Sequence, residues 1–222
     1  MDSGAPQKNR RVRVRVKICG ITNPADALDA IDAGADALGF NGYAGSKRKL
    51  DLKQAAAWIG QLPPFVTRVA VLVNPSFEEA ETVFALPGID LLQFHGNETP
   101  DFCMRFWPRL FIKAFPAKNE ACLEQAEAFG TRAVLLDTFV PGAFGGTGRL
   151  VNLELAASFV QAHPQMKVIL SGGLTPANVG EAIRAVRPYA VDVASGVESQ
   201  PGKKEKSLMR EFVAAANEAA GI

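Results

Sequence analysis

The segment VKICGIT at residues 16–22 joins a short apolar run to a loop that begins with glycine. β-Branched residues up to Cys19 are typical of a strand, and Gly20 marks the turn that ends it. In a barrel of repeated strand-helix units, the carboxyl ends of the strands carry the chemistry. The segment therefore predicts the first strand of such a barrel, with Cys19 at the end where reactions take place.

Similar apolar runs recur along the whole chain and alternate with longer amphipathic stretches. We predict eight strands, at residues 15–19, 37–40, 68–73, 91–94, 111–114, 133–136, 168–170 and 190–193. Units of about 26 residues are at the compact end for a (β/α)8 barrel. We therefore predict one α/β domain, a single TIM barrel over residues 15–222, after a flexible polar leader at residues 1–14. An open doubly wound sheet is the alternative, but no GxGxxG motif follows the first strand.

Composition excludes several function classes. The chain has 222 residues, with 24 Lys and Arg against 23 Asp and Glu, so no net field favours nucleic acid or an anionic membrane. Three cysteines without a CxxC pair argue against a disulfide framework or a zinc site. Neither a signal sequence nor an apolar run of about 18 residues is present. We expect a cytoplasmic protein that binds no metal, nucleic acid or membrane.

Two charged residues interrupt apolar strands that would be neighbours in a closed barrel. Lys17 shares a strand face with Cys19, and Asp192 lies within residues 190–193. Because the eighth strand closes against the first, we predict that Lys17 and Asp192 pair. An unpaired inward lysine is costly, and a paired one would also favour a thiolate at Cys19.

Cys19 and Asp137 each end a predicted strand, the first and the sixth, and would face each other across the barrel mouth. That arrangement suits two proton transfers on opposite sides of one substrate. A cysteine is a base only as its thiolate, at an ordinary pKa of about 8.5, and an aspartic acid donates only while protonated. From the residues alone two other readings stay open, a small buried hydrophobe for the cysteine and a helix cap for the aspartate.

Glycine-rich loops follow the last two predicted strands, with Gly172 and Gly173 in one and Ser195 and Gly196 in the other. Loops at these two positions commonly bind phosphate in such barrels, since glycine lets backbone N–H groups approach an anion. The alternative is that these glycines only turn the chain. We predict a phosphate site.

Three other features near predicted strand ends indicate a function less specifically. Gly145 and Gly146 lie in a glycine-rich loop after Asp137 that can fold over a ligand. Arg48 follows the second strand, where a guanidinium can bind a carboxylate through two hydrogen bonds or be solvated. His95 ends the fourth strand, and without metal-ligand spacing a structural or solvent-facing position is favoured.

Several motifs together resemble the phosphoribosylanthranilate isomerase family. They are VKICGIT at 16–22, ADALGF at 35–40, SKR at 46–48, LLQFHGNE at 91–98, LLDT at 135–138, FGGTG at 144–148, LSGGLTPANV at 170–179 and VDVASGVESQPGKK at 191–204. The resemblance covers the chain from about Arg15 onward. It implies an Amadori rearrangement of N-(5′-phosphoribosyl)anthranilate, in tryptophan biosynthesis, without a cofactor.

The resemblance also implies roles for single residues. Asp137 is similar to the general acid that protonates the ring oxygen of the sugar, and Cys19 to the base that takes the proton from its second carbon. Arg48 resembles the residue that holds the anthranilate carboxylate, and Asp192 an aspartate that lines the site. The loops at Gly172-Gly173 and Ser195-Gly196 resemble the phosphate cradle, and the loop with Gly145 and Gly146 covers the substrate.

The chain departs from the family at residues 41–44, where Asn-Gly-Tyr-Ala replaces an apolar and aromatic pair followed by proline. Two alternatives therefore stay open. One is another barrel isomerase acting on a related aminosugar phosphate, although that family uses paired aspartates where Cys19 stands. The other is a barrel that binds a phosphorylated ligand without catalysis. In each case the partner is a small molecule, and the chain is a monomer or a homodimer.

Overall fold

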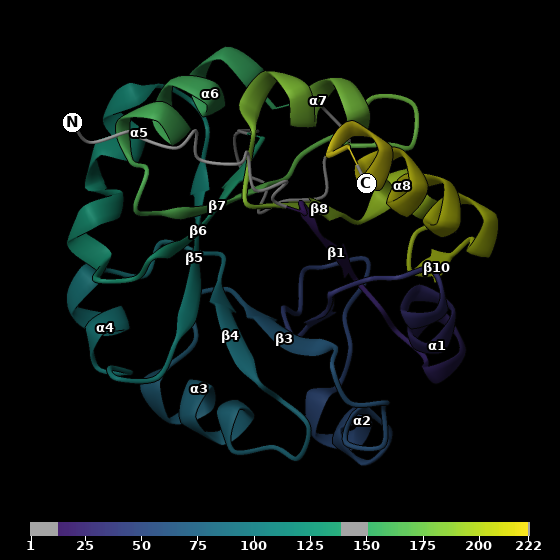
Figure 1. Ribbon diagram of the computed structural model, residues 1–222. Helices are drawn as coiled ribbons and strands as arrows, with labels where there is room; N and C mark the ends of the chain where they lie inside the picture. Colours follow the sequence, from purple (N-terminus) through teal and green to yellow (C-terminus); the bar gives the residue numbers. More distant parts are fainter. Residues whose placement is uncertain (1–12, 139–150, 222) are drawn as a thin grey trace, which may run out of the picture.

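The computed structural model describes residues 13–138 and 151–221, and its central feature is a closed barrel of parallel strands with helices outside it (Figure 1). Each strand pairs with the next along the chain, and the last returns to the first. The strands are β1 (Arg15–Cys19), β2 (Ala37–Asn41), β3 (Thr67–Leu72), β4 (Leu91–Phe94), β5 (Phe111–Pro116), β6 (Ala133–Asp137), β7 (Lys167–Leu170) and β8 (Ala190–Val193).

Helices follow the strands, and their starts carry the expected caps. The Asn23 side chain accepts the Asp26 amide with a proline at the first helical position, and Ser76 and Glu79 form a capping box. The helical elements are α1 (Pro24–Asp32), α2 (Leu52–Ile59), α3 (Phe77–Phe84), α4 (Pro100–Met104), α5 (Glu120–Glu124), η1 (Gln125–Phe129), α6 (Leu153–Ala162), α7 (Val179–Val186), η2 (Ser195–Val197) and α8 (Lys206–Ala219). A short hairpin of β9 (Glu198–Gln200) and β10 (Lys203–Lys204) precedes α8.

Strand alternation divides the apolar side chains into two groups. Residues such as Val16, Ile18 and Phe40 belong to the large core between strands and helices. A smaller cluster, separate from it, consists of Val69, Ile112, Ala114, Leu135, Ile169 and Ala190. Buried polar side chains also come from the strands: Lys17, Gln93 and Asp192 alternate with residues of the large core and so face the barrel interior, at the base of the site described below.

The predicted barrel is confirmed, and each observed strand lies within two residues of its predicted position. The clearest difference is β5, which continues to Pro116 because its backbone still pairs with β6 there, Pro116 opposite Asp137. Residues 1–12 of the predicted leader lie outside the described residues, so the domain boundary stays a prediction. Within the described part of the chain, no helix is long and apolar enough to cross a membrane.

Candidate active site

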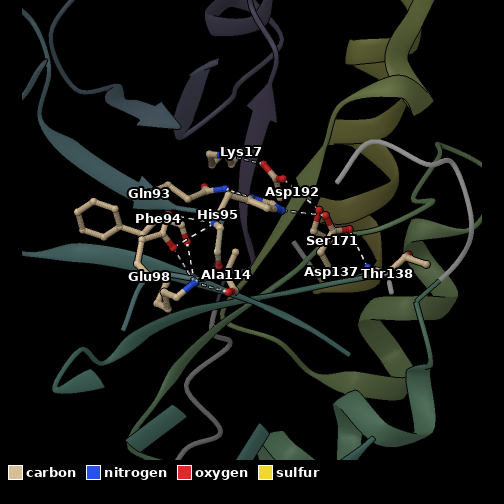
Figure 2. A network of polar contacts seen from close by, with 12 residues as sticks. Lys17, Gln93, Phe94, His95, Glu98, Ala114, Asp137, Thr138, Ser171 and Asp192 are labelled. Carbon is tan, nitrogen blue, oxygen red and sulfur yellow. Dashed lines mark hydrogen bonds and ion pairs between the residues drawn. The ribbon is translucent and has the colours of Figure 1, made fainter. Parts of the chain in front are cut away.

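Lys17 and Asp192 form the predicted ion pair inside the barrel. They are direct neighbours in the register of β1 and β8, and Lys17 Nζ lies 2.7 Å from Asp192 Oδ1. Ser171 Oγ donates to the other carboxylate oxygen at 3.1 Å (Figure 2). Both charged side chains are buried, 4% and 6% exposed, so the pairing removes the cost of an isolated charge.

Cys19 lies at the carboxyl end of β1, opposite Gly39 of β2. A Cβ atom on Gly39 would lie 2.6 Å from the Cys19 sulfur, closer than real Cβ contacts allow. The missing side chain at position 39 therefore provides the space in which the thiol sits. The charge of Lys17, two residues earlier on the same face of β1, also acts on the thiol.

Lys17 acts on the thiol in the predicted direction, but burial acts against it. Burial raises the pKa of Cys19, while the charges of Lys17 and Lys204 lower it and that of Asp192 raises it again. The net result is a raised pKa. Desolvation of the sulfur outweighs the nearby cations, which limit the rise.

Asp137 ends β6 and receives hydrogen bonds on each of its oxygens. The Thr138 backbone N–H donates to Oδ1 at 2.7 Å, and His95 Nε2 lies 3.2 Å from Oδ2. The carboxylate is 9% exposed, and Gly172 lies against it, since a Cβ atom there would be 3.0 Å from Oδ1. Asp137 is therefore held in one orientation and close to a predicted phosphate loop.

His95 is held between Asp137 and Gln93 (Figure 2). Gln93 Nε2 lies 2.8 Å from His95 Nδ1. The Gln93 side chain is buried, and its Oε1 atom has no hydrogen-bond partner within the described residues. The sequence reasoning favoured a structural or solvent-facing histidine, whereas this one contacts the predicted acid.

A buried ion pair stabilises the loop that carries His95. Lys113 Nζ lies 3.0 Å from Glu98 Oε2 and donates to the carbonyl oxygen of Gly96 at 2.8 Å. Glu98 in turn accepts from the backbone N–H groups of Gly96 and Asn74. Both charged side chains are at most 3% exposed. This pair connects the ends of β3, β4 and β5.

Arg48 is bound by a carboxylate of the protein itself. Its Nε and Nη2 atoms each donate to Glu198 at 2.7 Å, and Lys204 Nζ lies 2.9 Å from the same carboxylate. The side chain passes over Gly20, where no Cβ atom would fit, and so runs beside Cys19. One edge of the guanidinium is thus occupied, and a ligand carboxylate would need its remaining N–H groups.

The loops after β7 and β8 present backbone donors together. Gly172 and Gly173 have positive φ angles of 96° and 65°, which favour glycine. Gly196 packs directly on the Leu174 carbonyl, so the two loops touch. The backbone N–H groups of Gly173, Ser195 and Gly196 donate no hydrogen bond to any described residue. These free donors suit an anion.

The remaining predicted residues have different outcomes. Gly145 and Gly146 lie outside the described residues, so their part in the site stays a prediction. Within residues 13–138 and 151–221, no group of three or more His, Cys, Asp or Glu side chains is arranged to hold a metal ion.

Residues 16–215 match the family model described as N-(5′-phosphoribosyl)anthranilate (PRA) isomerase. The match spans the whole barrel, including Cys19, Asp137 and both glycine-rich loops. The chain belongs to this family. The resemblance stated from the motifs is therefore confirmed, as is the assignment of the chain to the isomerases.

Individual relatives cover nearly all of the barrel. A phosphoribosylanthranilate isomerase of Trichlorobacter lovleyi is 47% identical over 207 residues, which are 93% of this chain and 99% of that protein. The crystal structure of the Thermotoga maritima phosphoribosylanthranilate isomerase is 41% identical, with a TM-score of 0.83 over 91% of this chain and 98% of its own. Another isomerase structure, in complex with reduced 1-(o-carboxyphenylamino)-1-deoxyribulose 5-phosphate, is 40% identical, with a TM-score of 0.79 and the same coverage.

The sequence reasoning missed several polar residues in this isomerase site or directly behind it: Gln93, Lys113, Glu198 and Lys204. Two of them had a usable signal, because Gln93 and Lys113 interrupt apolar strands as Asp192 does. Glu198 and Lys204 had none, since their meeting depends on the β9–β10 hairpin.

Proposed function

We propose that this isomerase converts N-(5′-phosphoribosyl)anthranilate into 1-(2-carboxyphenylamino)-1-deoxyribulose 5-phosphate by an Amadori rearrangement, as a step of tryptophan biosynthesis. The observation that carries the proposal is the order of the strands. Asp137 ends β6, Cys19 ends β1, and the two glycine-rich loops follow β7 and β8, which lie between them in the barrel. A phosphate bound by those loops leaves the attached sugar between the acid and the base.

In the first step, Asp137 acts as the general acid. Its proton passes to the ring oxygen of the furanose while the bond from that oxygen to the first carbon breaks, which gives an open-chain Schiff base. The hydrogen bonds from Thr138 and His95 hold the carboxyl group in place for this transfer.

In the second step, Cys19 acts as the general base. Its thiolate takes the proton from the second carbon of the sugar, and the resulting enolamine tautomerises to the ketone. Lys17 and Lys204 both favour the thiolate over the thiol, against the larger effect of burial. We propose that this cationic neighbourhood supplies the fraction of thiolate that the reaction uses.

The ends of the substrate have separate binding groups in this proposal. The N–H groups of Gly173, Ser195 and Gly196 bind the phosphate, with Gly172 as the turn between them and Asp137. The remaining N–H groups of Arg48 bind the anthranilate carboxylate, and Asp192 keeps Lys17 charged beside the base. A solved relative holds a carboxyphenylamino sugar phosphate, a ligand of the same class.

A turnover assay tests the function. Phosphoribosylanthranilate is generated in place, and the loss of its fluorescence is followed with purified protein. We expect turnover by the wild type, and losses of about 10²-fold or more in Cys19→Ala and Asp137→Asn. Binding of a reduced product analogue by the wild type without turnover would instead indicate a barrel that binds the ligand without catalysis.

The same preparation tests the finer expectations on the protein itself. We propose a cytoplasmic enzyme that needs no cofactor, and chelator-treated, gel-filtered protein is expected to keep full activity. Light scattering with size exclusion decides between monomer and homodimer.

A further inference from the structure

The contacts of His95 extend beyond holding Asp137 in place. Thr138 N–H faces Oδ1 of the carboxyl group and can only donate, so a proton on Asp137 must be carried by Oδ2. His95 Nε2 lies 3.2 Å from that oxygen. The nitrogen next to the proton-bearing oxygen of the acid therefore belongs to a side chain that itself carries exchangeable protons.

The side-chain amide of Gln93 can point either its NH2 group or its oxygen at His95, and each orientation suits a different protonation state of the ring. With Gln93 Nε2 toward His95 Nδ1, the ring keeps its hydrogen on Nε2 and donates to an ionised Asp137. In this orientation the buried Gln93 Oε1 has no partner among the described residues. With the amide turned, Oε1 accepts from Nδ1–H. Nε2 of the neutral ring can then accept a proton, and Nε2–H of the doubly protonated ring can pass one to Asp137.

We propose that His95 is a positioning residue that reloads Asp137 with a proton after each ring opening, with Gln93 as its adjustable partner. The proposal rests on the proposed function, in which Asp137 gives its proton to the sugar. His95 protonated on both nitrogens passes the Nε2 proton to Asp137 Oδ2, so an N–H bond breaks and an O–H bond forms. The ring stays neutral with its hydrogen on Nδ1, bound by Gln93 Oε1, and solvent water returns a proton to Nε2.

The other buried charges near His95 and Asp137 are paired with one another and not with these two residues. Lys17 is paired with Asp192, and Lys113 with Glu98, all four with buried side chains (Figure 2). Lys113 and Glu98 also fix the loop after His95 through Gly96, so the imidazole starts from a defined position. Among the described residues, His95 has side-chain hydrogen-bond contacts with Gln93 and Asp137, and of these two only Asp137 is ionisable. The His95 side chain is 15% exposed, which gives solvent access to the ring.

The test separates a hydrogen bond from a transferable proton. His95→Gln keeps a donor near the position of Nε2 but cannot give up a proton. We expect kcat to fall by about 10-fold or more, with KM within about twofold of the wild type and an unchanged melting temperature. His163→Gln is the matched control, because His163 contacts Glu127 away from the site, and it is expected to keep the wild-type kcat.

Two further variants keep the proposal falsifiable if His95→Gln does not fold. In His95→Ala, added imidazole is expected to raise kcat several-fold, following the imidazolium concentration, which a purely structural histidine would not do. Gln93→Met removes the acceptor for Nδ1–H and should lower kcat while sparing KM. A wild-type kcat in folded His95→Gln or Gln93→Met, or no rescue by imidazole, would overturn the relay. An inactive wild type would instead overturn the proposed function.

Discussion

At the scale of single residues, the pKa of the Cys19 thiol is set by opposing effects, of which burial is the largest. Burial disfavours its thiolate, and the charges of Lys17 and Lys204 favour it. Each of these lysines is itself bound to a carboxylate, Lys17 to Asp192 and Lys204 to Glu198. The proposed base is therefore controlled by residues that need not touch the substrate.

Alkylation of Cys19 measures this balance. Because its pKa is raised above the ordinary 9.0, we expect the rate of reaction with iodoacetamide to continue rising beyond that pH. Lys17→Met removes a favourable charge, so it should slow alkylation further at any fixed pH, by about tenfold for each unit of pKa. A Cys122→Ser background isolates the signal, since burial raises the pKa of Cys103 to about 12. An unchanged rate in folded Lys17→Met would contradict the effect.

Gly39 supplies a second test at this scale. A methyl group there would meet the Cys19 sulfur at 2.6 Å and displace it from its position. We expect Gly39→Ala to fold and to lose about 10²-fold in kcat, the cost of a misplaced reacting group. Gly180→Ala is the control and should keep its activity. It lies on α7, where a Cβ atom would meet the flexible end of Arg184 and, at an ordinary contact distance of 3.8 Å, the Ala215 carbonyl oxygen. Equal activity of the two variants would show that the Cys19 sulfur can shift without loss of function.

At the scale of elements, the β9–β10 hairpin connects loops of the site that the barrel strands do not connect. It brings Glu198 and the fully buried Lys204 together, and Glu198 in turn binds Arg48 from the loop after β2. Lys204 also donates to the Ala194 carbonyl, at the start of the loop that carries Ser195 and Gly196. Arg48 and the loop proposed to bind phosphate thus depend on the same hairpin.

Glu198→Gln tests this element through its dependence on pH. Burial raises the pKa of Glu198. The charges and hydrogen bonds of Arg48 and Lys204 lower it by more in total, so the net shift is downward. A lowered pKa contributes stability above the ordinary value of 4.5, and that contribution is lost as pH falls through the folded-state value. Urea unfolding should show the variant less stable by about 3 kcal/mol at neutral pH, with the difference shrinking under acid conditions. A pH-independent difference would exclude the charge as its cause.

At the scale of the whole molecule, the barrel is closed where β1 meets β8, the two barrel strands farthest apart in the sequence. Lys17 and Asp192 face each other there, 175 residues apart along the chain. Their ion pair is buried, so it carries a desolvation cost that only the intact pair offsets.

Removing one partner should therefore cost more than removing both. We expect Lys17→Met to lower the free energy of unfolding by about 3–5 kcal/mol, because it leaves Asp192 charged and buried. The double variant Lys17→Met with Asp192→Leu should recover much of that loss, measured by urea unfolding. Additive losses would mean that the two side chains do not stabilise each other.

The order of strands and helices could be predicted because it depends on local patterns. Alternating apolar runs, helix caps and glycine turns are all written in neighbouring residues, and with them the positions of Cys19 and Asp137 at strand ends. Even the long-range Lys17–Asp192 pair was predictable, since closing the barrel puts the first strand beside the last. The adjacency of the two glycine-rich loops after β7 and β8 was predictable for the same reason.

Other properties of the site depend on how distant segments meet in space. Desolvation of the Cys19 thiol, which outweighs the cations beside it, depends on all the atoms that exclude water. His95 reaches Asp137, and Glu198 reaches Arg48, across 42 and 150 residues of sequence. The sequence alone determined the barrel and the chemical groups around its mouth. Only the tertiary structure decided which of those groups bind one another and how their protons are held, because burial and hydrogen bonding act between residues that the sequence keeps apart.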